Sequence, residues 1–109
     1  MHLFKISVNV PEEFAEELMD AVTEAIDAPY DNYERVFTTS KVTGTWRPVN
    51  KARPFKGSID VIEIAEELKI EFIVQKKDLA SAIRAVIDVH PYEEPAIDVI
   101  EMKDWHSII

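Results

Sequence analysis

The chain twice carries a strand-like alternation followed directly by a helical pattern, and this repeated order restricts the folds open to it. Residues 4–10 and 68–75 alternate between apolar and polar side chains. A period of two is typical of a strand with one buried face. Apolar side chains then recur at helical spacing across 11–27 and again from 79 to 87, before Pro91 ends the second pattern. The sequence therefore predicts two strand-then-helix units.

Two further extended segments complete the order of elements. Residues 33–46 are rich in Val, Thr, Phe and Lys, and residues 96–102 follow the second helical pattern. The third strand is expected to begin near Ile59 and to kink at 65–67, and Gly44 is expected to mark a bulge or a close approach of backbones. The resulting βαββαβ order favours an α+β, ferredoxin-like fold, a four-stranded antiparallel sheet with two helices on one face.

Length and composition narrow the class of protein. The 109 residues suit one domain, 1–109, with a C-terminal tail at 103–109. No apolar stretch approaches the ~20 residues of a membrane span. The sequence shows no export signal and no cysteine, which favours a cytoplasmic location. With only two glycines, the chain has no glycine-rich phosphate loop.

Charge is distributed unequally along the chain. The formal net charge is -9, yet residues 35–59 contain six basic side chains and no acidic one, so this segment carries +6 and the rest -15. An acidic surface repels duplex phosphates, and we expect no nucleic-acid partner. The basic segment suits a small anion or an acidic face on another copy, or it is simply a solvated loop.

The densest group of chemistry-bearing residues lies between two prolines, in the run His-Pro-Tyr-Glu-Glu-Pro at 90–95. Proline favours an extended conformation for the residue before it, so His90 and Glu94 belong to a stiff connection between helix and strand. An imidazole, a phenol and two carboxylates held in this way suit a cation, a polar ligand or a neighbouring chain. A plain turn with solvated carboxylates is the alternative.

Two separated motifs resemble a known family. They are GTWRP at 44–48 with Asn50, Pro54-Phe55 and Gly57, and HPYEEPAIDV at 90–99. Together they resemble the insert domain of the Nif-three-like proteins, the YqfO-type dinuclear-metal-centre hexameric proteins, as a stand-alone chain. The resemblance covers Leu3 to about Met102 and implies a PII/CutA-like fold that tends to trimerise. The family's paired metal ions are held by flanking domains, so the resemblance implies no dinuclear site on these residues.

The proline-framed run alone also resembles the HPYEVPEI stretch of the CutA divalent-cation-tolerance proteins. This resemblance implies binding of copper-like divalent cations. The matching residues are His90, Pro91, Tyr92, Glu93 and Pro95, whereas Glu94 replaces an apolar position.

A divalent metal site is one hypothesis for this run. His90 with Glu93 or Glu94, joined by His106 or His2 from the same or another subunit, would supply nitrogen and oxygen ligands suited to zinc or copper. A hydrogen-bonded structural histidine is the alternative.

The main functional hypothesis is a non-enzymatic oligomeric binding or regulatory module. No serine or cysteine nucleophile lies in a recognisable motif, so catalysis is not expected. Arg47 and Arg53 would bind carboxylate or phosphate oxygens of a small anionic ligand at a subunit cleft, and Trp46 or Phe55 would stack on it. A purely structural bridge between subunits, or a protein partner, is the alternative. The predicted ligand-binding residues are Trp46, Arg47, Arg53, His90, Tyr92, Glu93 and Glu94.

The predicted sheet leaves one face and two edges uncovered. Ile62 and Ile73 are apolar positions expected on that outer face, and the tail is apolar as well. We expect sister subunits to cover this surface in a homo-oligomer, a trimer. Isolated exposed isoleucines on a monomer are the alternative.

Overall fold

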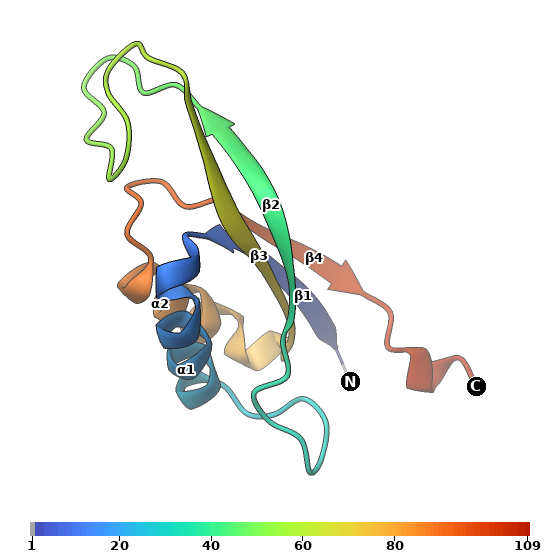
Figure 1. The fold of residues 1–109 in the computed structure, drawn as a ribbon. Coiled ribbons are helices and arrows are strands. Elements are labelled where there is room, and N and C mark those ends of the chain that lie inside the picture. The colour runs from blue at the N-terminus through green and yellow to red at the C-terminus, as the bar shows by residue number, and fades with distance from the viewer. Residues whose placement is uncertain (1) are drawn as a thin grey trace.

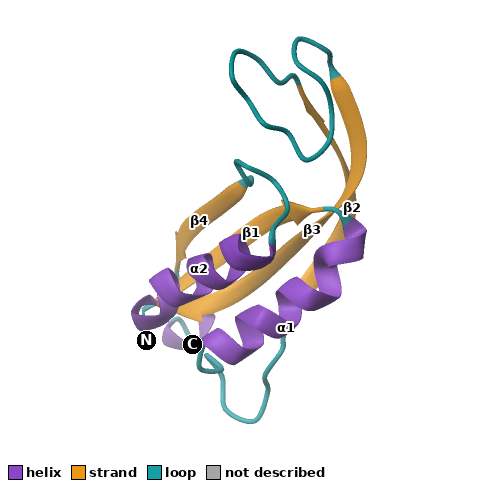
Figure 2. Ribbon diagram, turned by 90° about the vertical axis from the view of Figure 1, so that its left-hand side faces the viewer, coloured by secondary structure: helices purple, strands orange, loops and turns teal. Residues whose placement is uncertain are grey.

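The computed structural model describes residues 2–109, which form a sheet layer and a helix layer (Figure 1). The sheet is antiparallel, with strand order β2-β3-β1-β4, and both helices cover the same face (Figure 2). The predicted βαββαβ fold is confirmed. Within the described residues, neither helix is long and apolar enough to cross a membrane. The elements are β1 (Leu3–Val10), α1 (Ala15–Ala25), β2 (Thr38–Trp46), β3 (Glu63–Gln75), α2 (Leu79–Val89) and β4 (Ile97–Met102), with 3-10 turns at Glu12–Phe14, Lys76–Asp78 and Trp105–Ser107.

Apolar side chains of the central strands join the two layers. Val8 of β1 lies opposite Ile70 of β3, and both side chains are fully buried. From the helix layer, Leu18 and Val22 of α1 and Val86 of α2 are fully buried in the same cluster. Removing a side chain of this size from water contributes about 1.5–3 kcal/mol. The core therefore follows the alternation seen in the sequence.

The second strand begins later than the predicted residue 33. Asn32 and Arg35 have left-handed backbone, with φ of 71° and 55°. These two residues turn the chain, so it becomes regular strand only at Thr38. The last residue before the strand, Phe37, packs edge-on against Phe72 with ring centroids 5.4 Å apart.

The third strand also begins later than predicted, at Glu63. Ile59 and Val61 belong to the long loop 47–62, because Asp60 has left-handed backbone with φ of 64°. The Asp60 N–H donates to the Pro48 carbonyl at 2.6 Å, which holds the two sides of the loop together.

Strands β2 and β3 form a ribbon that extends beyond the helices (Figures 1 and 2). Their pairing is continuous from Thr38 opposite Glu71 to Trp46 opposite Glu63. The strand is therefore not interrupted at 65–67, where the sequence predicts a kink. The pattern of burial along β3 does change there. Ala65 and Glu67 are buried at odd-numbered positions, whereas from Ile70 onward the even-numbered positions are buried. The alternation is therefore shifted by one residue between Glu67 and Ile70.

The outer face of the sheet differs in detail from the prediction. Ile62 lies in the loop, so its expected place on this face is wrong. Ile73 does lie there, opposite Lys5 of β1, and Ile100 of β4 lies opposite Lys5 on the other side. Ile100 is 56% exposed, so an apolar side chain remains on this face of the chain.

Candidate functional site

A pocket of about 330 Å³ lies where the β2–β3 ribbon, the loop 47–62 and the connection 90–96 meet. Figure 1 shows this loop folding back toward the connection between α2 and β4. Segments far apart in the sequence therefore supply its walls. The lining residues used below are Gly44, Trp46, Phe55, Lys56, Glu67, Tyr92, Glu93 and Glu94.

Aromatic rings form one side of this pocket. Tyr92 lies between Trp46 and Phe55, with ring centroids 5.5 Å and 6.1 Å away. Phe55 also meets Phe14 edge-on at 5.8 Å. The Trp46 indole N–H donates to the Lys56 carbonyl at 3.2 Å. The long loop is thus fastened to the end of β2, and the Trp46 ring is fixed in position.

His90 supports this cluster from behind, with its ring 4.9 Å from the ring of Tyr92. Its Nδ1 accepts the Tyr92 backbone N–H at 3.1 Å, so Nε2 carries the proton and donates to the Asn9 carbonyl at 2.7 Å. Burial lowers the pKa of His90, which agrees with a neutral ring. With both nitrogens engaged, His90 is not available as a metal ligand beside Glu93 or Glu94.

The other two histidines are also paired elsewhere. His2 Nε2 lies 2.6 Å from a Glu101 carboxylate oxygen, and His106 Nδ1 lies 2.7 Å from Asp104. Among residues 2–109, no three His, Asp or Glu side chains are grouped so that they could hold a metal ion. The predicted zinc or copper site at residues 90–94 is therefore not formed in this chain by itself.

Glu67 is the site residue that the sequence analysis missed. Only 6% of the residue is exposed, and its Oε2 has no hydrogen-bond partner among the described residues. An unsatisfied buried polar group costs about 1–3 kcal/mol, and a charged one costs more. A buried polar atom without a partner therefore needs an explanation beyond packing.

The surroundings of Glu67 are built to hold its carboxylate. A Cβ at Gly44 would collide with Oε1, so the glycine makes room for it. What comes close to Gly44 is the Glu67 side chain rather than the expected second backbone, and the unbroken pairing there excludes a bulge. Burial, then a side-chain hydrogen bond with Glu67 and the charge of that carboxylate, raise the pKa of Tyr92, so the phenol keeps its proton. Gly44 was the only signal in the sequence for a buried side chain at Glu67.

The two arginines predicted to bind an anion do not line the pocket. The Arg47 Nε donates to the Asp60 carbonyl at 3.2 Å, and its guanidinium lies 3.8 Å from the Asp60 carboxylate. Arg53 contributes its backbone N–H, which donates to Glu93 Oε2 at 2.8 Å. These contacts fix the loop 47–62 and leave neither guanidinium in the lining.

The charged lining of the pocket is mostly acidic. Three of its four charged side chains are carboxylates, those of Glu67, Glu93 and Glu94, and the fourth is the exposed Lys56. The structure therefore brings together four of the predicted residues, Trp46, Tyr92, Glu93 and Glu94, and places His90 behind them. Arg47 and Arg53 lie outside.

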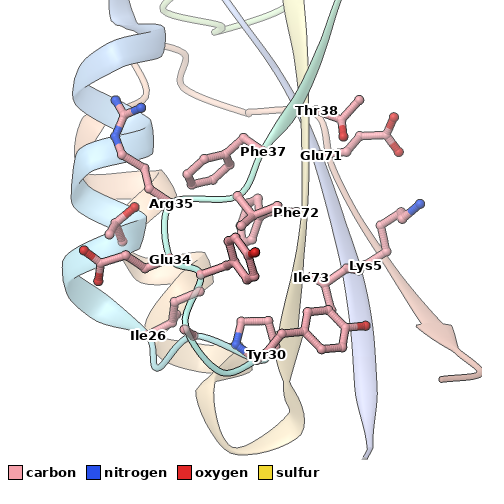
Figure 3. Close-up of a pocket in the computed structure, with 15 residues that line it drawn as sticks. Lys5, Ile26, Tyr30, Glu34, Arg35, Phe37, Thr38, Glu71, Phe72 and Ile73 are labelled. Atoms are coloured by element: carbon pink, nitrogen blue, oxygen red, sulfur yellow. The ribbon is translucent and has the colours of Figure 1, made fainter. Parts of the chain in front are cut away.

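A second pocket, of about 170 Å³, lies at the opposite end of the sheet (Figure 3). Phe37 and Phe72 form its apolar wall, and Tyr30 and Ile73 lie near its opening. The guanidinium of Arg35 points away from it, toward Asp20 and Glu16. Among the described residues, Glu67 alone has a buried side-chain polar atom without a partner, so this second pocket offers less specific chemistry.

The fold and the site define a class of protein. The chain has a PII/CutA-like fold: it superposes on CutA of Archaeoglobus fulgidus, a periplasmic divalent cation tolerance protein, with a TM-score of 0.68 and 20% identity, covering 95% of this chain and 86% of that one. On B. subtilis GlnK the TM-score is 0.64, also at 20% identity, covering 94% and 87%. At such identities the likeness concerns the fold alone.

Within this class, the chain is homologous to one part of the NIF3-related proteins, their insert portion. It is 36% identical over 102 residues to a GTP cyclohydrolase 1 type 2 homolog of Staphylococcus epidermidis and 38% identical over 102 residues to that of Halalkalibacterium halodurans, covering 94% of this chain in each case. It superposes on a Bacillus cereus protein related to NIF3 with a TM-score of 0.79 and 31% identity, covering 94% of this chain and 26% of that one.

The chain spans only 28% and 27% of the length of these two relatives. The predicted resemblance is confirmed as homology to that part. No protein-family model matches the chain.

Proposed function

We propose that this chain is a non-enzymatic, oligomeric binding or regulatory module whose ligand site is the pocket between Trp46, Phe55 and Tyr92. The observation that carries the proposal is the buried carboxylate of Glu67 in the lining of an aromatic-walled pocket. Pockets that combine apolar walls with a few placed polar groups are the usual form of small-molecule sites.

The pocket chemistry supports binding rather than catalysis. Its lining contains no serine or cysteine, and the imidazole of His90 behind it uses both nitrogens in hydrogen bonds. Tyr92 has a raised pKa, which makes it a poor base near neutral pH. The word cyclohydrolase in the names of the relatives refers to proteins that are more than three times as long.

Association of copies is the second part of the proposal. Ile73 and Ile100 leave apolar surface on the sheet face opposite the helices, and β2 has a neighbouring strand on one side only. Open strand edges and apolar faces are commonly covered by other chains. The sequence predicts a trimer that is located in the cytoplasm and binds no nucleic acid, and these points stay predictions. Sedimentation velocity measures the number of copies in the assembly.

A ligand screen tests the site. In a Trp105→Phe background, Trp46 is the only tryptophan, so its fluorescence reports on the pocket. Nucleotides, small carboxylates, organic amines and divalent metals are screened by fluorescence and thermal shift. We expect at least one class to quench Trp46 and raise Tm.

The matched variants are Phe55→Ala in the pocket and Tyr33→Ala at the other end of the sheet, since both side chains are more than half exposed. The response is expected to disappear in the first and persist in the second. If no compound responds, or if Phe55→Ala responds like the wild type, the proposed site is wrong.

A further inference from the structure

Building on the proposed function, we propose that the ligand of this pocket is an organic cation, an ammonium or guanidinium group, held by the Glu67 carboxylate and the faces of Trp46 and Tyr92.

The buried carboxylate is the first reason. Glu67 is 94% buried, lines the pocket and has no hydrogen-bond partner for Oε2 among the described residues. Gly44 leaves the space that its Oε1 occupies. A buried charge is tolerated best when an opposite charge and donors compensate it. An ammonium or guanidinium group supplies both.

The aromatic rings are the second reason. A cation within about 6 Å of an aromatic centroid is attracted to the ring face, and tryptophan is the strongest partner. The Trp46 N–H is already used by the Lys56 carbonyl, so this ring has no free donor to offer and presents its face. Tyr92 keeps its proton and stays neutral. The Tyr92 hydroxyl is directed to Glu67, so both residues offer a ligand their ring faces, which attract a positive charge.

The charge of the lining is the third reason. An anion would meet Glu67, Glu93 and Glu94 in the lining, while Arg47 is engaged with Asp60 outside it. Arg53 gives the site only a backbone N–H, and this is already bound to Glu93. Like charges at short range repel, so this arrangement selects against anionic ligands.

Calorimetry with paired probes tests the inference. n-Butylammonium is compared with butan-1-ol, and methylguanidinium with N-methylurea; citrate and inorganic phosphate are the anions. We expect at least one cation to bind and its neutral counterpart to bind at least about tenfold more weakly, since loss of a charged hydrogen-bond partner has that effect.

Three variants assign the effect to residues. Glu67→Gln is expected to weaken cation binding at least about tenfold. Trp46→Leu, which leaves Glu67 in place, is expected to weaken it about two- to thirtyfold, and so keeps the test open if Glu67→Gln does not fold. Glu24→Gln, an exposed acid-to-amide change on α1, is the matched control and should bind as the wild type does.

The outcomes separate this inference from the proposed function. Binding of citrate, phosphate or a nucleotide without any cation would overturn the cation inference and leave the binding module standing. If Glu67→Gln dissociates an oligomer and no free cation binds the wild type, a basic side chain of a second copy occupies the pocket. This outcome would also overturn the inference of a small organic cation. No binding of any compound would overturn both.

Discussion

Strand β3 passes through two regions of opposite character. In the helix-covered region its inward-facing side chains, such as Ile70, are apolar and buried in the core. Only three residues away, in the ribbon beyond the helices, Glu67 is almost as deeply buried and has an unpartnered oxygen. Apolar burial in the first region stabilises the fold, whereas burial of a polar group in the second region destabilises it. The difference separates the scaffold from the site.

The supporting residues follow the same division. Around Ile70, the neighbours are other apolar side chains such as Val8 and Leu18. Around Glu67 they are Gly44 and Tyr92, and His90 lies behind the latter. Tight apolar packing gives stability, and a held polar group in a pocket gives recognition.

The largest expected effect lies in the scaffold. Ile70→Ala should lower the free energy of unfolding by about 2–5 kcal/mol, because it opens a cavity in the core. Glu67→Gln should lower it by less than about 1 kcal/mol, because the amide oxygen can still accept from Tyr92 and Oε2 has no hydrogen bond to lose. Urea denaturation of both variants makes the measurement. Equal losses would mean that Glu67 is as structural as Ile70, and the comparison would fail.

An intermediate effect is expected at His90. At pH 8, His90→Gln should lower the free energy of unfolding by about 1–3 kcal/mol through its lost hydrogen bonds. The pKa of His90 is lowered in the folded protein, so the unfolded chain binds its proton first as the pH falls. The free energy of unfolding of the wild type should therefore fall as the pH drops below 6.5, the ordinary pKa of histidine. It should keep falling until the pH reaches the lowered pKa of His90 in the folded protein.

Urea titrations from pH 8 to pH 5 measure this dependence. The pH-dependent difference between wild type and His90→Gln isolates His90 from the other titrating groups, and His2→Gln, at an exposed histidine, serves as the control. A constant difference across this range would contradict the assignment of His90 as a buried neutral residue.

The smallest effect is expected at Arg47. Its ion pair with Asp60 is exposed on both sides, so Arg47→Ala should cost no more than about 1 kcal/mol. Ligand binding in the pocket should not change, because the guanidinium lies outside it. Loss of binding in Arg47→Ala, but not in an Arg84→Ala control, would favour the anionic mode predicted from the sequence over the cationic one.

Much of the fold could be predicted because its causes are local. The alternation in 4–10 and 68–75 specified two strands with one buried face, and the helical spacing after each specified the helices. The strand boundaries were less accurate, because left-handed residues such as Arg35 and Asp60 interrupt segments whose composition favours strand. Aspartate tolerates a positive φ better than arginine does, but neither residue type requires one, so the sequence does not locate these turns.

The candidate site, too, was predictable only in part. By itself, the sequence determined the two-layer fold and pointed to Trp46 and the run from His90 to Glu94, because proline restriction and aromatic placement can be recognised locally. Only the tertiary structure decided that His90 is used up in hydrogen bonds, that Arg47 turns away, and that Glu67 is buried against Gly44. The physical reason is that burial and charge pairing depend on which distant segments meet, and the pairing of β2 with β3 and the fold of the long loop bring those segments together.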